Sequence, residues 1–168
     1  KNIYFAVYDQ VLSTTVNVDE ITDIDMGTDS IYKYVMPLGV ASLTDTITGS
    51  RENGTVFYTP TVNIILNRLT KEDQNEIKLL GQTKVIIFAE LNATLASNGH
   101  TVIVCLGRVN GMELNAGTMD SGAAFGDRGG YTLTFDGLET EPFIMVKDYT
   151  ASPFDNADSG AQIPIVSS

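Results

Sequence analysis

The sequence predicts a mainly β protein, an antiparallel β-sandwich or barrel with one flanking α-helix. Three observations lead to this prediction. Short runs rich in Val, Ile, Tyr, Phe and Thr recur along the chain and are separated by Gly, Asn and Asp, which is typical of strands joined by turns. Residues 131–135 alternate strictly between large apolar residues and threonine, so their sheet has one apolar and one polar face. Only residues 71–80 have a helical pattern.

The strands are predicted from β-propensity and from the turn residues between them. We expect strands at residues 1–8, 31–35, 55–69, 84–91, 101–106, 131–135 and 138–146. Asn53-Gly54 and Asn98-Gly99 indicate turns, because both residue types tolerate positive φ. Pro60 lacks an amide hydrogen, so we expect it at an edge, at a bulge or outside the strand. Asn110-Gly111 is either a tight turn or a bulge inside one long strand.

The helix is predicted over residues 71–80. Thr70 is a good N-cap, and the acidic residues of the first turn suit the positive end of the helix dipole. Ile77 and Leu80 share one side of the helix, and Gly81 is typical of the residue that follows a helix. Because a helix of this length is marginal alone in water, we expect it to lie on a sheet.

Length and composition predict one domain over residues 1–168, since 168 residues with 43% hydrophobic content can bury a core. Residues 51–146 carry the regular pattern and are predicted to form the core sheet and helix. Residues 9–50 are rich in Thr, Asp and Ser, and we interpret them as an extended N-terminal arm with loops that becomes ordered on a neighbour. The alternative is an ordinary strand-and-loop half of a sandwich. Residues 147–168 are predicted to be an irregular C-terminal tail.

The charge excludes one large class of function. The formal net charge is -11, and such a field repels nucleic acid phosphates and provides no counterion-release affinity. The chain is therefore not a conventional DNA- or RNA-binding domain. No apolar run approaches the roughly 20 residues that span a bilayer, so we expect no membrane insertion.

The residues that usually carry chemistry are sparse, and we expect no enzyme, no cofactor and no bound metal. The sole histidine, His100, sits in a predicted turn, and the sole cysteine, Cys105, sits in an apolar strand as a small hydrophobe. Residues 23–29 superficially resemble a calcium loop. However, Gly27 and Tyr34 occupy the positions where an EF-hand needs an Asp or Asn and a Glu. The glycine-rich residues 122–130 lack the Gly-Lys-Ser/Thr of a P-loop.

A glycine-punctuated pattern in the second half of the chain points to a family. It consists of Leu106-Gly107-Arg108-Val109-Asn110-Gly111-Met112-Glu113-Leu114, Gly117-Thr118, Ser121-Gly122, Gly126-Asp127 and Gly130-Tyr131-Thr132-Leu133-Thr134-Phe135. Together with the preceding strand–helix–strand order, this pattern resembles the C-terminal half of bacteriophage major tail (tail tube) proteins. The resemblance covers about residues 55–145. It favours a strand that continues through Asn110-Gly111.

The resemblance implies a structural virion protein that self-assembles into stacked, hexameric rings. The rings would form a phage tail tube through which DNA passes as a cargo repelled by an acidic wall. The implied partners are copies of the chain itself and other phage tail proteins. The implied location is the virion tail, after assembly in the cytoplasm of a bacterial host.

Alternatives remain within and outside this class. They are another virion component such as a baseplate or connector protein, a bacterial injection-system tube protein, and a small enzyme on a β scaffold. The candidate inter-subunit contacts are polar and aromatic residues of the expected arm and of the 115–130 connection: Asp23, Asp25, Tyr32, Tyr34, Asp120, Asp127 and Arg128. Asp127 and Arg128 could pair across a subunit boundary.

Overall fold

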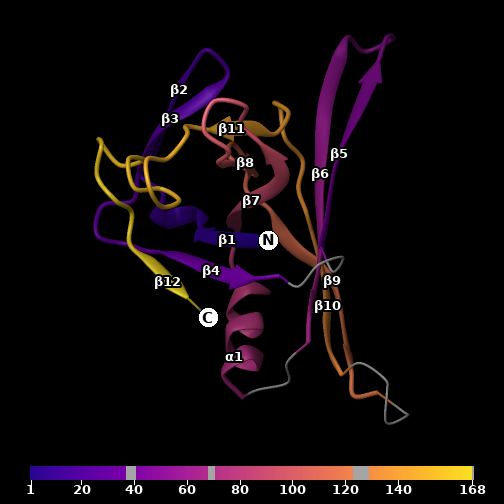
Figure 1. Ribbon diagram of the computed structural model, residues 1–168. Coiled ribbons are helices and arrows are strands. Elements are labelled where there is room, and N and C mark those ends of the chain that lie inside the picture. Colours follow the sequence, from indigo (N-terminus) through magenta and orange to yellow (C-terminus); the bar gives the residue numbers. More distant parts are fainter. Residues whose placement is uncertain (37–40, 68–70, 123–128, 168) are drawn as a thin grey trace.

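The computed structural model shows two β-sheets and one short helix (Figure 1). It describes residues 1–36, 41–67, 71–122 and 129–167. The larger sheet has eight strands: β1 (Asn2–Val7), β2 (Ser13–Asn17), β3 (Glu20–Asp25), β4 (Ile31–Val35), β7 (Val85–Thr94), β8 (Thr101–Leu106), β11 (Ile144–Val146) and β12 (Ile165–Ser167). The smaller sheet has four: β5 (Ala41–Ser50), β6 (Thr55–Leu66), β9 (Glu113–Asp120) and β10 (Gly130–Asp136).

The pairing of the strands confirms the mainly β class and corrects one part of the prediction. The larger sheet has the order β12-β4-β1-β7-β8-β11-β3-β2, and the smaller has the order β5-β6-β10-β9. The smaller sheet is antiparallel throughout. The larger sheet is mixed, because β11 runs parallel to β3 and β12 runs parallel to β4. An antiparallel fold throughout was therefore the wrong expectation, and the two sheets do not close into a barrel within the described residues.

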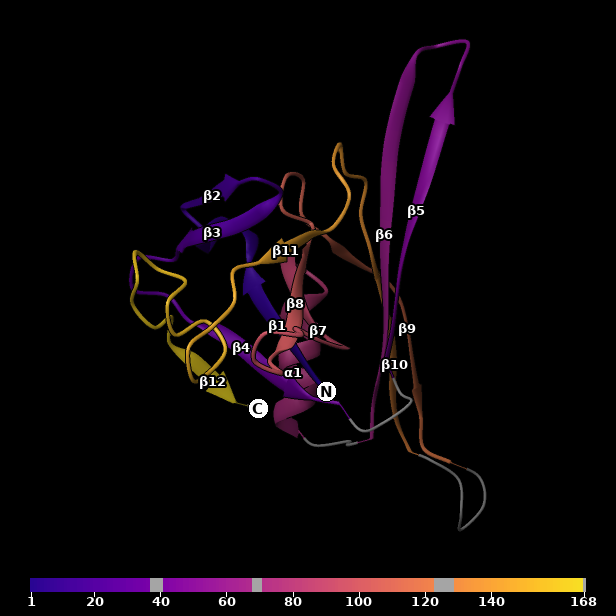
Figure 2. The same ribbon diagram turned by 45° about the horizontal axis from the view of Figure 1, so that its top comes forward.

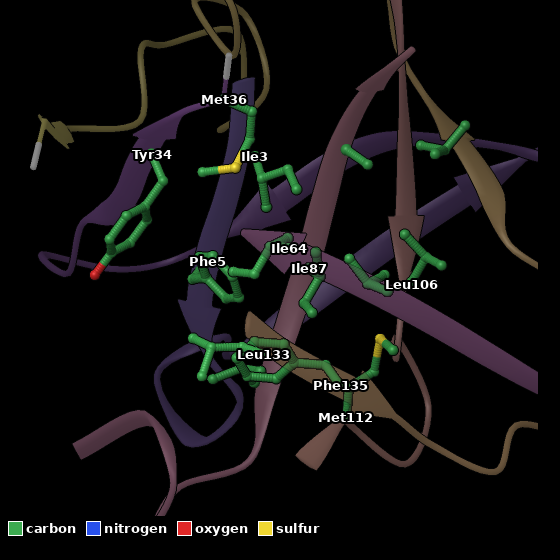
Figure 3. Close-up of a cluster of buried hydrophobic side chains, with 14 of the residues drawn as sticks. Ile3, Phe5, Tyr34, Met36, Ile64, Ile87, Leu106, Met112, Leu133 and Phe135 are labelled. Atoms are coloured by element: carbon green, nitrogen blue, oxygen red, sulfur yellow. The ribbon is translucent and has the colours of Figure 1, made fainter. Parts of the chain in front are cut away.

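A buried cluster joins the two sheets face to face. Figure 3 shows Ile3, Phe5, Ile87 and Leu106 of the larger sheet meeting Ile64, Leu133 and Phe135 of the smaller one. The strict alternation predicted for residues 131–135 is observed in β10, where every second side chain enters this cluster. The helix α1 (Lys71–Leu80) packs Ile77 and Leu80 against the same cluster, as expected for a short helix that needs a sheet. The predicted N-cap Thr70 lies outside the described residues.

A second buried cluster covers the opposite face of the larger sheet. We expected residues 147–168 to be an irregular tail, and most of the described part is irregular, yet Phe154, Ala157 and Ile163 are buried on the sheet. The ring of Phe154 makes edge contacts with Tyr4 and Phe88, with ring centroids 5.1 Å and 5.2 Å apart. The C-terminal segment is therefore a structural layer, because its scattered apolar side chains cover a face that would otherwise meet water.

The expected arm at residues 9–50 also differs from the structure. Strands β2, β3 and β4 belong to the larger sheet, and Ile21, Ile24 and Ile31 are fully buried beneath the C-terminal segment. These isoleucines are spaced without a clear strand period, so their common burial was not visible in the pattern. The strand β5, by contrast, leaves the body of the molecule as one strand of a long hairpin with β6 (Figure 2).

Two further predictions concern single positions. Pro60 lies inside β6 opposite Asp45, but β10 pairs with β6 only as far as Thr61, and Pro60 offers only its carbonyl, to Gly137 at 3.3 Å. Its missing N–H therefore lies where the regular β6–β10 ladder stops, before the isolated bridge between Tyr58 and Glu139, so Pro60 is inside the strand but not within that ladder. Continuation through Asn110-Gly111 is wrong. The chain leaves β8 and turns into β9 at residues 107–111, where two glycines adopt positive φ.

Candidate assembly surface

The outer face of the smaller sheet is polar and carries no basic residue among the residues described. Strand alternation and the observed register identify the side chains that point away from the core. They are Ser42, Thr44, Thr46, Thr48, Ser50, Thr55, Thr59, Thr61, Asn63, Glu113, Thr118, Asp120, Thr132, Thr134 and Asp136, interrupted by Phe57, Ile65 and Ala116. We call this surface the threonine face. Within it, the Thr134 hydroxyl donates to Asn63 Oδ1 at 2.7 Å.

The smaller sheet is open at both margins. Strands β5 and β9 each pair with a single neighbour in the described part of the chain. Because the four strands alternate in direction, β5 and β9 run antiparallel to each other. A second copy placed beside the first can therefore continue the sheet as an antiparallel ladder, with its β9 against β5 of the first copy.

The hydrogen-bonding direction of β5 follows from one observed pair. Tyr58 of β6 exchanges backbone bonds with Glu139, on the side away from β5. Ile47 lies opposite Tyr58. In an antiparallel ladder, two facing residues either bond to each other through their backbone N–H and C=O groups, or both direct these groups away from the partner strand. The N–H and C=O of Ile47 therefore point out of the sheet. The same holds at every second residue of β5, which adds Leu43, Asp45 and Gly49.

The β5–β6 hairpin extends well past the larger sheet (Figure 2). Its turn occupies residues 51–54 and includes Gly54 at φ +62°, as the Asn-Gly pair predicted. Beyond the end of β10 the hairpin is a two-stranded ribbon, and it exposes apolar side chains such as Ile47, at 67%, and Val56. A ribbon of this kind is marginal alone, so its projection is a feature that a neighbouring molecule can stabilise.

The predicted contact residues do not form one site. Asp23 and Asp25 lie on β3, where their carboxylates accept the N–H groups of Ser159 and Gly27, so both stabilise turns within the chain. Tyr34 is buried and packs its ring edge-on against Phe5. These three residues therefore have partners within the subunit, and their contacts between subunits stay a prediction.

The remaining predicted contact residues differ in exposure. Tyr32 on β4 is 41% exposed and lines an open depression together with Leu79 of the helix. Asp120 ends β9 on the threonine face, where its carboxylate accepts the N–H of Gly122 at 2.9 Å. Asp127 and Arg128 lie outside the described residues, so their suggested pairing stays a prediction.

Cys105 and His100 belong to residue types that often act in catalysis, and both make contacts within the fold. Cys105 is buried, and burial raises the pKa of its thiol far above the usual value, so the thiolate needed of a nucleophile is suppressed. His100 Nδ1 lies 3.0 Å from Asp148, and the imidazole stacks on Tyr149 with ring centroids 4.4 Å apart. The histidine was expected to be a turn residue, and it additionally connects the β7–β8 turn to the C-terminal segment.

One buried carboxylate connects the two sheets. Glu139 is buried, and its oxygens accept the N–H groups of Val109 and Asn110 at 3.0 Å and 2.9 Å. These bonds hold the 107–111 turn against the segment that leads from β10 to β11. Glu139 is therefore satisfied by the backbone, as buried carboxylates must be.

The described residues contain no group of His, Cys, Asp or Glu side chains arranged to hold a metal ion. No helix in that part of the chain has the length and apolar character needed to cross a membrane. Comparison of the chain with protein-family models, with curated proteins and with solved structures gave no match. The surface features of the molecule are therefore the observations on which a function can be argued.

The sequence did not indicate two of these features. The outward projection of the β5–β6 hairpin was missed, although its strand pattern and turn were present in the sequence. The exposed tip of the β2–β3 hairpin was missed because Val18-Asp19 is not a usual turn pair.

Proposed function

We propose that this protein is a structural subunit that assembles with copies of itself into rings, and that the rings stack into a bacteriophage tail tube. The observation that carries the proposal is the open antiparallel sheet with a free strand at each margin. A contact between β5 of one copy and β9 of the next is heterologous, and heterologous contacts close into rings when the rotation permits. The resemblance of residues 55–145 to tail tube proteins supports this reading of the margins.

In this proposal the threonine face lines the channel. Hydroxyl groups and the carboxylates of Asp120 and Asp136 would face the passing DNA, and a third carboxylate, Glu113, is paired with Lys84 at 3.6 Å at the edge of the face. DNA is then a repelled cargo, and the wall gains nothing from counterion release. The other implied partners are further phage tail proteins, and the implied location is the virion tail after assembly in the bacterial cytoplasm.

The projecting β5–β6 hairpin supports the stacking part of the proposal. It extends along the strand direction of the smaller sheet, and its apolar side chains at Ile47 and Val56 have no cover within the described chain. In a stack, a hairpin directed along the tube axis reaches the next ring. Burial of these two side chains would contribute about 1.5–3 kcal/mol each.

The experiment is electron microscopy of the purified protein combined with size-exclusion chromatography over a range of concentrations. Rings or tubes whose wall contains a continuous β-sheet are the expected result. Rings that never stack favour a connector or baseplate component. Tubes alone do not distinguish a phage tail from a bacterial injection system, and the genes that neighbour the coding sequence would make that distinction. A strict monomer at high concentration overturns the proposal.

A further inference from the structure

The tip of the β2–β3 hairpin is unusual in both conformation and exposure. Its two central residues, Val18 and Asp19, have φ values of +51° and +62°. Turns with positive φ at both positions are common between paired strands, but Asn, Asp and Gly normally occupy them. A β-branched residue with positive φ is an outlier and is strained. Val18 nevertheless occupies this position with 89% of its surface exposed.

The strained valine borders an open groove of about 780 Å³. The other residues that line it are 141–145, which run into β11 beside Glu20, and among them Phe143 and Met145 are 40% and 50% exposed. Three apolar side chains that the fold leaves partly or wholly uncovered therefore meet around one depression. Clustered exposure of this kind marks interaction surfaces more often than single exposed residues do.

The charges of the groove define what can enter it. Its lining includes the carboxylates of Asp19, Glu20 and Glu141 and no Lys or Arg. Glu141 is paired with the guanidinium of Arg108. Asp19 and Glu20, by contrast, make no side-chain hydrogen bond or ion pair within the described residues. Two uncompensated carboxylates beside an apolar depression favour a ligand that combines apolar side chains with positive charge.

We infer that this groove, formed by Val18–Glu20 and residues 141–145, is a docking site for an extended, basic and apolar segment of a different protein. A second copy is a poor occupant, because a chain with a formal net charge of -11 brings further carboxylates toward Asp19 and Glu20. The inference concerns the larger sheet and does not depend on ring formation by the smaller one.

Val18→Asn gives the sharpest test, because docking and folding predict changes of opposite sign. Asparagine tolerates positive φ, so the variant should unfold at a higher temperature than the parent protein. The same change removes the apolar side chain at the groove, so binding of a partner should weaken about tenfold, the equivalent of one buried valine. Val35→Asn is the matched control, since Val35 is 64% exposed on β4, away from the groove.

The binding probe is a labelled peptide of about eight residues that alternates Leu and Lys, which places the apolar side chains on one face of an extended chain. Its affinity is measured by fluorescence anisotropy, and the contact is mapped by amide chemical shifts. A peptide with Glu in place of Lys is the charge control. Asp19→Asn combined with Glu20→Gln should weaken binding of the Lys peptide severalfold, and Glu52→Gln at the β5–β6 turn should not.

The expected result is saturable binding of the Lys peptide to the groove, weakened about tenfold in Val18→Asn and unchanged in Val35→Asn. The inference is overturned if Val18→Asn binds as well as the parent protein, or if the Glu peptide binds equally. It is also overturned if chemical shifts change mainly elsewhere. Sedimentation without peptide could show that Val18→Asn self-associates more weakly than the parent protein. That result would identify the groove as a contact between copies, which also contradicts the inference. If Val18→Asn forms rings normally, a change in peptide binding concerns the groove and not the proposed assembly through the sheet margins.

Discussion

A proline at position 47 tests the sheet-margin contact directly. Ile47 lies on the free edge of β5, its N–H points outward, and its side chain is mainly exposed. Proline there removes an outward donor and leaves the β5–β6 ladder of the monomer intact, because the facing pair Ile47 and Tyr58 shares no backbone bond. We therefore expect Ile47→Pro to fold like the parent protein, because proline is tolerated on the free side of an edge strand.

The expected effect on assembly is much larger than the effect on folding. In a ladder between copies, the loss of one N–H leaves the facing carbonyl without its partner, which costs about 1–3 kcal/mol. The proline ring also holds the approaching strand away. Since 1.4 kcal/mol is a factor of ten, each contact should weaken about 5–150-fold. Every subunit of a ring makes this contact, so the loss multiplies around the ring.

The assay is sedimentation velocity at matched concentrations of the parent protein, Ile47→Pro and Ile47→Thr. Ile47→Thr is the control, because it retains the N–H and a β-branched side chain. Parent protein and Ile47→Thr should assemble, and Ile47→Pro should remain monomeric at concentrations at least tenfold higher. Normal rings from Ile47→Pro, with circular dichroism that confirms folding, would refute the edge-to-edge contact.

Three further predictions concern folding and reactivity. Phe154→Ala removes a buried ring that contacts Tyr4 and Phe88, so urea unfolding should show a loss of about 3–5 kcal/mol; an unchanged midpoint would mean that the C-terminal segment does not stabilise the sheet. The Asp155 carboxylate accepts the N–H groups of residues 150–152, which lowers its pKa, so its stabilisation is present above the unfolded value of about 3.9 and is lost as pH falls through the folded pKa. Thermal unfolding between about pH 5 and pH 2 should therefore depend less on pH in Asp155→Asn, and an identical profile would contradict this assignment. Cys105 should react with a thiol reagent only after unfolding, because burial raises its pKa; rapid labelling of the native protein would show that the strand opens.

The elements that sequence reasoning recovered are those with strong local signals. The helix at residues 71–80, the alternating strand β10 and the turns at Asn53-Gly54 and Asn98-Gly99 depend on propensity and spacing within a few residues. Pro60 was recovered in part, since it lies inside β6 but just past the last regular pair with β10, where its missing N–H breaks no ladder bond.

The features that were missed depend on contacts between distant parts of the chain. The parallel pairing of β11 with β3 joins residues 144–146 to residues 20–25, and no local pattern encodes such a partner. Phe154 is a single aromatic residue in a polar segment, and only the uncovered face of the larger sheet gives it a place to pack. Val18 has a left-handed backbone conformation that turns normally assign to Asn, Asp or Gly, so sequence rules could not predict a turn there.

The two proposed surfaces should respond to salt in opposite directions. Contacts between copies bring together chains with a formal net charge of -11, and the free margins β5 and β9 carry acidic residues such as Asp45 and Glu113. Salt shortens the Debye length from about 10 Å at 0.1 M to about 3 Å at 1 M, so it should reduce this repulsion and promote rings. The groove at Val18 attracts a positive segment through Asp19 and Glu20, so the same salt should weaken docking there. A single salt titration followed by sedimentation and by peptide binding therefore separates the two surfaces, and parallel responses would show that one of the assignments is wrong.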